Sequence, residues 1–245
     1  MATATASPAL VRHPNRSVER LFFTGMAIVI LVSVAIGFAR TYYLAGVFRA
    51  KLPAPIIHVH GAVFSCWVLL LIVQTGLISA RRVDLHRRVG VLGFGIASLM
   101  VILGVLAATS SLHRNFAPPG LDPLTFYVIP MTDMLIFSVL AFFAWRARFD
   151  PASHKRLILI ATIALMVAPI VRWPFAWIFL KPLAAQLITY LLLLALVIYD
   201  FWSLGKIHRA TLWASIFLVV VQMTRVPLAQ TAPWHAIAAW VQRLT

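Results

Sequence analysis

The chain has 245 residues, of which 62% are hydrophobic and 11% charged, and its formal net charge at pH 7 is +15. A soluble domain of this length does not bury so much apolar surface, and apolar runs of about 18 or more residues, typical of membrane-spanning helices, recur along the chain. The alternating short segments of a β-barrel are absent. The positive charges lie in short loops beside the apolar runs, which excludes nucleic acid as the expected partner and favours the lipid bilayer.

In chain order, the sequence predicts a tail, seven membrane spans and a short amphipathic segment. Residues 1–18 are rich in Ala, Thr, Ser, Pro and Arg and are predicted to be a disordered cytoplasmic tail. The apolar core Leu21–Phe38 is too long for a signal peptide, and we interpret it as a retained first helix. The predicted spans cover residues 19–40, 55–80, 89–112, 124–147, 157–180, 183–204 and 209–229.

Short connections between these spans predict antiparallel neighbours in one all-α bundle, a single transmembrane domain over residues 19–229. Lys and Arg concentrate on the side of the N-terminus, which predicts an N-terminus inside and a C-terminus outside, in a bacterial cytoplasmic (inner) membrane. Residues 230–245 are predicted to form an amphipathic helix at the outer interface. Its apolar residues at helical spacing are Trp234, Ile237, Val241 and Leu244.

Three ionised residues lie inside predicted spans, namely Asp133, Arg172 and Arg225. A charge near the centre of the bilayer costs about 2.5–3.5 kcal/mol on insertion scales, so each is expected to have a partner, a wet cavity or a function. With the predicted orientation all three fall in the outer half of the membrane, together with His58 and His60 at the outer start of the second span.

We therefore predict an outer-half polar pocket, in which one acid and two arginines leave a surplus positive charge. His60 is favoured over His58 as the histidine that faces the pocket, because the two side chains point in nearly opposite directions on a helix. The surplus guanidinium would bind a small anionic ligand or a haem propionate. The alternative is a structural Asp–Arg pair with Arg225 reaching the outer headgroups. The remaining candidate pocket residues are Gln74, Trp173 and Gln222.

On the inner side, three helices begin with a histidine followed by a cation: His86-Arg87, His154-Lys155 and His208-Arg209. Three imidazoles on one face predict a three-nitrogen metal site. The basic neighbours oppose a divalent cation, and the alternative is that these residues anchor the inner ends of the helices at the membrane interface.

A resemblance to a known family depends on four pieces of the sequence. They are His58-Val-His60-Gly61, Gln74, Leu85-His86-Arg87-Arg88-Val89-Gly90 and His154-Lys155-Arg156-Leu157. With them the chain resembles a family of uncharacterised bacterial multi-pass membrane proteins, over most of residues 20–225. The resemblance implies a location and no mechanism. More loosely, a histidine-bearing helical bundle is similar to the b-type haem membrane cytochromes, but two axial histidines at one depth on facing helices are not evident.

Three functions fit these observations. The first is a redox or electron-transfer module, with haem b or a quinone in the outer pocket, His58 or His60 as axial ligand, and Arg172 and Arg225 as propionate partners. The second is a transporter or binding protein for a small anion or an amphiphile. The third is a membrane-embedded metal hydrolase that uses histidines and Asp133. The sequence contains no P-loop, G-x-S-x-G motif or paired carboxylates, and it assigns no catalytic residue.

Overall fold

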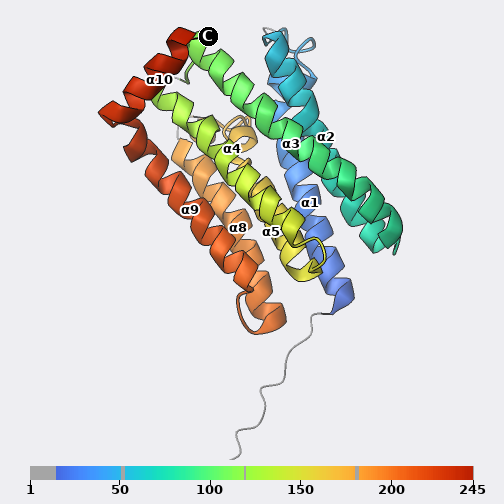
Figure 1. Ribbon diagram of the computed structural model, residues 1–245. Coiled ribbons are helices and arrows are strands. Elements are labelled where there is room, and N and C mark those ends of the chain that lie inside the picture. Colours follow the sequence, from blue (N-terminus) through green and yellow to red (C-terminus); the bar gives the residue numbers. More distant parts are fainter. Residues whose placement is uncertain (1–14, 51–52, 119, 180–181, 245) are drawn as a thin grey trace, which may run out of the picture.

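The structure is a computed structural model that describes residues 15–50, 53–118, 120–179 and 182–244. Every element in these ranges is helical (Figure 1). The elements are α1 (Arg16–Phe38), a π-helical turn η1 (Ala39–Tyr43), α2 (Pro55–Ser79), α3 (Val83–His113), α4 (Pro123–Arg146), α5 (Pro151–Ala164), α6 (Val167–Ile170), α7 (Ala176–Phe179), α8 (Pro182–Leu204), α9 (Arg209–Ala229) and α10 (Ala232–Leu244).

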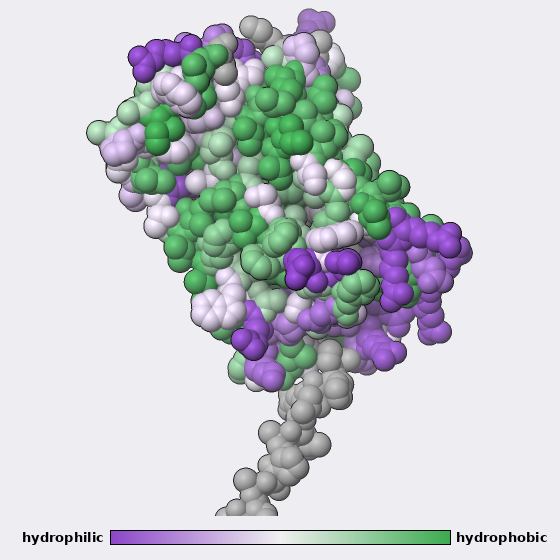
Figure 2. All heavy atoms as spheres, in the orientation of Figure 1, coloured by the Kyte–Doolittle hydropathy of each residue, from purple (hydrophilic) through white to green (hydrophobic). Residues whose placement is uncertain are grey.

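Seven helical segments of the described chain are long and apolar enough to cross a membrane, which confirms the predicted all-α multi-pass bundle. The start of α1 and the α2–α3, α4–α5 and α8–α9 connections lie at one end, which we call the N-terminal end; η1, the α3–α4 connection and α10 lie at the other, the C-terminal end (Figure 1). Figure 2 shows apolar residues over the middle of the visible face and hydrophilic residues gathered toward both ends. This surface suits a protein whose sides contact lipid.

Helix starts follow local capping chemistry. Asn15, Asp122 and Asp150 each accept a hydrogen bond from a backbone N–H in the first turn of the helix that they precede, and α2, α4 and α5 begin with proline. The side-chain caps pair with N–H groups of the first turn, and a proline at the helix start removes one N–H group that would otherwise be unpaired. α1 begins at Arg16, so residues 16–18 of the predicted tail are helical, and residues 1–14 lie outside the described residues.

The predicted fifth span, residues 157–180, differs most from the structure. It is divided into α5, α6 and α7, and the segment long and apolar enough to cross a membrane is Pro151–Ile170, which contains α5 and α6. Pro169 and Pro174 lack the N–H group that an α-helix needs, which accounts for interruptions near them. Gly37 of α1 lies so close to Pro169 that an added Cβ would overlap the carbonyl group of Pro169. Only glycine allows α1 and α6 to approach in this way.

The core is centred on α5, whose span is 61% buried inside the bundle, whereas the span formed by α2 is 11% buried. α5 packs against α4, α8 and α9, and its fully buried Ile160, Ile163 and Ala164 join the main apolar cluster. Helices α2 and α3 pack mainly against each other, with α2 also on α1 and α3 on α4. Polar groups on α5 are therefore enclosed by protein, while those at the ends of α2 and α3 are partly accessible.

The predicted C-terminal helix is present as α10, and it lies across the C-terminal end of the bundle (Figure 1). Trp234 and Val241 pack with the buried Ala238 against α3 and α4, as an inward stripe requires. The stripe differs from the predicted one, because Ile237 and Leu244 are exposed.

Candidate functional site

Of the two predicted intramembrane arginines, Arg225 is the one that pairs with Asp133, in the half of the bundle nearer its C-terminal end. Arg225 Nη1 donates to Asp133 Oδ1 at 2.8 Å, and Arg225 Nη2 donates to Gln186 Oε1 at 3.1 Å. Gln186 Nε2 then donates to Gln222 Oε1 at 2.6 Å, and Gln222 Nε2 donates to the carbonyl of Ala164 at 3.3 Å. We call these five residues the Asp133 network; it joins α4, α5, α8 and α9.

The Asp133 network satisfies its own charges. The side chains of Arg225 and Asp133 are 6% and 13% exposed, and both arginine Nη atoms are engaged by protein groups. A buried charge pair with additional hydrogen bonds holds helices together, and no surplus charge is left for a ligand at this point. The geometry therefore favours a structural Asp–Arg pair, but Arg225 is the buried partner of Asp133 and does not extend to the headgroups as the structural alternative expected.

Arg172 is placed differently. Its side chain is exposed, donates from Nη1 to the carbonyl of Ala168 at 2.5 Å, and lies 5.1 Å over the ring of Phe38. Its neighbour Trp173 donates from Nε1 to the carbonyl of Ser33 at 3.1 Å, which ties the segment after α6 to α1. Among the described residues Arg172 has no carboxylate partner.

His60 lies close enough to Arg172 to interact with its charge. The ring of His60 packs on Phe64, 4.1 Å between ring centres, and a backbone hydrogen bond links the ring to Leu103 of α3. Its Nδ1 atom is buried without a hydrogen-bond partner. We call His60 and Arg172 the His60 site. Tyr42 of η1 donates to the carbonyl of His58 at 2.8 Å, which fixes the neighbouring backbone.

The structure thus divides the predicted pocket. Asp133, Arg225 and Gln222 belong to one network, and His60 and Arg172 belong to another site. Gln74 belongs to neither, because it lies near the end of α2 at the N-terminal end of the bundle, 14 residues or about 21 Å of helix after His60.

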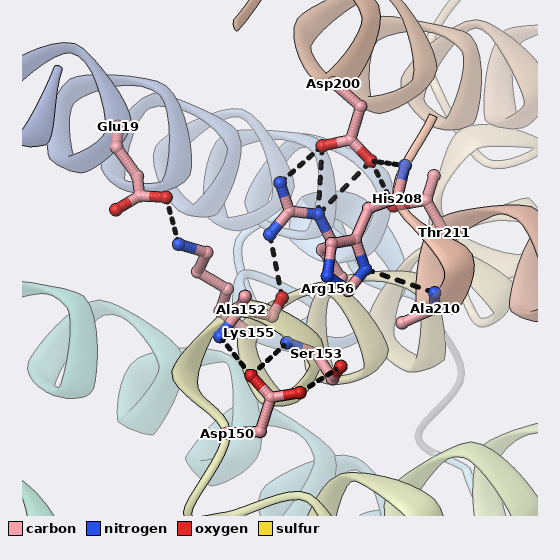
Figure 3. A network of polar contacts seen from close by, with 10 residues as sticks. All are labelled: Glu19, Asp150, Ala152, Ser153, Lys155, Arg156, Asp200, His208, Ala210 and Thr211. Atoms are coloured by element: carbon pink, nitrogen blue, oxygen red, sulfur yellow. Dashed lines mark hydrogen bonds and ion pairs between the residues drawn. The ribbon is translucent and has the colours of Figure 1, made fainter. Parts of the chain in front are cut away.

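A second buried ion pair, at the N-terminal end, was not predicted (Figure 3). Arg156 donates from Nε and Nη2 to Asp200 Oδ1 at 2.9 and 2.5 Å, and from Nη1 to the carbonyl of Ala152 at 2.8 Å. Asp200 Oδ2 accepts from the Thr211 hydroxyl at 2.5 Å and from the His208 backbone N–H at 3.1 Å. We call these five residues the Arg156 network. The ion-pair side chains are 1% and 0% exposed.

Of the three predicted metal-binding histidines, the structure brings two together. The rings of His86 and His154 lie 6.5 Å apart between their centres. His208 instead caps α9, where its Nδ1 accepts from the N–H of Ala210 at 3.1 Å. Among the described residues no group of three His, Cys, Asp or Glu side chains is arranged to hold a metal ion, so the predicted three-histidine site is not formed.

Asp150 and His208 lie just before the spans of α5 and α9, and both have shifted pKa values. The hydrogen bond from the Ser153 hydroxyl, at 2.5 Å, and those from the first-turn N–H groups of α5 lower the pKa of the Asp150 carboxyl. Burial and the nearby charge of Arg156 lower the pKa of His208. Both shifts keep the capping atom unprotonated near neutral pH, and so both favour the helix starts at which these residues lie.

Three residues that determine this arrangement were missed from the sequence. Asp200 and Gln186 lie inside the predicted 183–204 span and should have been treated like Asp133, because an acid or amide in an apolar helix needs a partner. Arg156 was interpreted as a topology-determining loop charge, since it lies at the start of a span next to Lys155. Only packing shows that Lys155 reaches Glu19 while Arg156 turns inward.

Comparisons of the chain with protein-family models, with curated proteins and with solved structures find no match. The resemblance carried by His58, His60 and the two histidine–cation segments therefore stays a prediction.

Proposed function

We propose that this multi-pass membrane protein binds, at the His60 site, an amphiphile whose polar head carries an acidic group or an ionisable hydroxyl. The observation that carries the proposal is the unbalanced charge of Arg172. Asp133, the acid predicted to share a pocket with Arg172, is engaged by Arg225, and Arg172 has no carboxylate partner within the described part of the chain. A guanidinium without a counter-ion binds carboxylates and phosphates strongly.

His60 supports the same ligand chemistry. A neutral imidazole has one N–H donor and one acceptor nitrogen, and the Nδ1 atom of His60 is buried without a partner. When Nδ1 holds the lone pair, it accepts a hydrogen bond from a ligand O–H group. If the ligand loses that proton, the resulting oxyanion lies close enough to Arg172 for their charges to attract. The surrounding Phe38 and Phe64 contribute apolar surface for the rest of an amphiphile.

The redox form of this proposal has a quinone as its ligand. A quinol offers an O–H group that donates a hydrogen bond to His60 Nδ1, and the guanidinium of Arg172 would stabilise the oxyanion that forms when the quinol loses its proton. Haem b, with a propionate on Arg172 and His60 as axial ligand, is the other redox candidate. A haem or a quinone would indicate electron transfer, and another amphiphile would indicate transport or binding. The first experiment therefore identifies the ligand.

The first experiment is an optical spectrum of the detergent-purified protein, as isolated and after dithionite, with mass spectrometry of the extracted lipids. A Soret band identifies haem; a stoichiometric quinone or acidic lipid identifies the amphiphile. A colourless protein that retains none of these and does not bind an added ubiquinone analogue or a long-chain carboxylate would contradict the proposal.

The matched variants are Arg172→Ala and Arg146→Ala, since both residues are exposed arginines and only Arg172 lies at the His60 site. We expect Arg172→Ala to weaken retention of the ligand about 10-fold or more and Arg146→Ala to leave it unchanged. Equal retention by the two variants would show that Arg172 only contacts lipid headgroups.

A further inference from the structure

A second set of polar groups lies at the N-terminal end of the bundle, between α2, α3 and α5. The side chains are Gln74, His86 and His154. Gln74 and His86 are in contact, because a backbone hydrogen bond links the His86 ring to Gln74. Gln74 also packs over Gly90, one turn after His86, where an added Cβ would lie 3.4 Å from Gln74 Nε2. His86 and His154 face each other across 6.5 Å between ring centres.

Each of the three side chains has an acceptor atom that the protein leaves free. His154 Nδ1 lies 2.9 Å from the carbonyl of Ala144, which accepts, so the ring is protonated on Nδ1 and the lone pair is on Nε2. His86 Nδ1 and Gln74 Oε1 are buried without a hydrogen-bond partner. A buried polar atom without a partner costs roughly 1–3 kcal/mol.

We infer that Gln74, His86 and His154 bind one first-row transition metal ion of the zinc class. Three acceptor atoms with no matching donor suit a cation, and imidazole nitrogen with an amide oxygen suits this class of metal. Two imidazoles that ligate one tetrahedral ion at about 2.0–2.1 Å have ring centres roughly 5 Å apart. The rings of His86 and His154 are 6.5 Å apart between their centres, so they would move closer together when the ion binds. A backbone carbonyl on the far nitrogen of a ligating histidine, as for His154 and Ala144, orients the ring.

The nearby charges allow this assignment. Arg87 and Arg88 follow His86 directly, and the charge of Arg87 acts on the His86 ring. Both arginine side chains are exposed, so solvent screens them in part. The Asp150 carboxylate acts on His154 and provides negative charge on the same side. Because Gln74 lies about 21 Å of helix from His60, this site is independent of the ligand proposed above.

The test is a titration of the chelator-treated, detergent-purified protein with Zn²⁺ by calorimetry and with Co²⁺ by absorption spectroscopy. We expect one ion per chain, and a loss of at least about 10-fold in affinity for His86→Ala and for His154→Ala. His113→Ala is the matched control, because His113 is an exposed histidine at the other end of α3, and it is expected to bind as the wild type does. Size-exclusion profiles establish that each variant is folded.

Gln74→Glu provides a test that does not depend on losing a side chain. A carboxylate in place of the amide oxygen should tighten Zn²⁺ binding, whereas a purely structural Gln74 gives no reason for a gain. Absence of stoichiometric metal binding by the wild type would overturn the assignment. The assignment would also be overturned if His86→Ala and His154→Ala both bound Zn²⁺ with the affinity of the wild type.

Discussion

Two parts of the bundle differ in whether their buried polar side chains have partners: helices α4, α5, α8 and α9 on one side, and helices α2 and α3 on the other. In α4, α5, α8 and α9 the buried charges are paired: Arg156 with Asp200 and Arg225 with Asp133. In α2 and α3, His60, Gln74 and His86 each have a buried polar atom without a partner. The unpartnered buried atoms of α8 and α9, within the described chain, are all hydroxyls, namely those of Tyr190, Tyr199, Ser203 and Ser215.

This difference separates groups that hold the fold from groups that are available to ligands. A closed network joins helices and leaves no capacity for another molecule, whereas an imidazole or amide with a free atom is incomplete until something binds. Burial accounts for the division. The α5 span is largely enclosed by the other helices, whereas the α2 span is mostly peripheral.

The largest effect is expected from breaking the Arg156 network. Asp200→Ala leaves the guanidinium of Arg156 buried without a counter-charge, and we expect a loss of about 3–5 kcal/mol in unfolding free energy. The measurement is equilibrium unfolding in mixed micelles. Asp84→Ala removes an exposed acid and should change stability by less than about 1 kcal/mol. Similar effects of the two substitutions would show that the Arg156–Asp200 ion pair does not stabilise the fold.

The Asp133 network is expected to be the weaker of the two. Asp133→Ala removes the carboxylate, but Arg225 keeps its hydrogen bond to Gln186, so we expect a loss of about 3 kcal/mol. The same unfolding assay compares it with Asp200→Ala. A larger loss for Asp133→Ala would make the Asp133 network the stronger one. The substitution should leave ligand retention at the His60 site unchanged. A loss of ligand would show that Asp133 belongs to the same site as His60 and Arg172.

Helix caps come next. Asp150→Ala removes the acceptor of two first-turn N–H groups of α5 and should cost about 1 kcal/mol at neutral pH. Because the hydrogen bonds lower the pKa of Asp150, its contribution is complete above the ordinary aspartate pKa of about 3.9 and is lost as pH falls through the lower folded-state value. The difference between variant and wild type should therefore disappear in strongly acidic buffer, as measured by thermal unfolding.

Titration of His208 is expected to have a smaller effect on stability, at a pH nearer neutral. Burial lowers its pKa in the folded chain, so the unfolded chain binds more protons just below about pH 6.5. Its contribution is therefore complete above that pH and declines as pH falls toward the lower folded-state pKa. His208→Asn retains a capping acceptor that does not titrate, and its midpoint of thermal unfolding should fall less between pH 7.5 and 5.5 than that of the wild type. An identical fall would exclude His208 from the pH dependence.

The smallest expected effect on stability is that of Arg172→Ala. The side chain is exposed and its hydrogen bond is to a local carbonyl, so the unfolding free energy should change by no more than about 0.5 kcal/mol. Loss of ligand without loss of stability is the result that marks an open site. A loss comparable with that of Asp133→Ala would place Arg172 among the structural charges.

Much of the fold was predictable because bilayer thickness and backbone hydrogen bonding act on local sequence. Apolar length places the spans, and the observed 209–229 helix agrees with its predicted bounds because His208 and the following turn define its ends. The fifth span was misjudged because hydropathy does not register that Pro169 and Pro174 interrupt a helix. The membrane orientation stays a prediction from the distribution of Lys and Arg.

The sequence by itself determined that this chain crosses a membrane seven times and which side chains are too polar to lie in it unpartnered. Tertiary structure alone decided the partners. Asp133 accepts from Arg225 and not from Arg172. Arg156 pairs with Asp200 while its neighbour Lys155 pairs with Glu19, and Gln74 meets His86 and not His60. The physical reason is that an apolar pattern specifies how deep a residue lies in the membrane, whereas the rotation and packing of each helix decide which neighbour it meets at that depth.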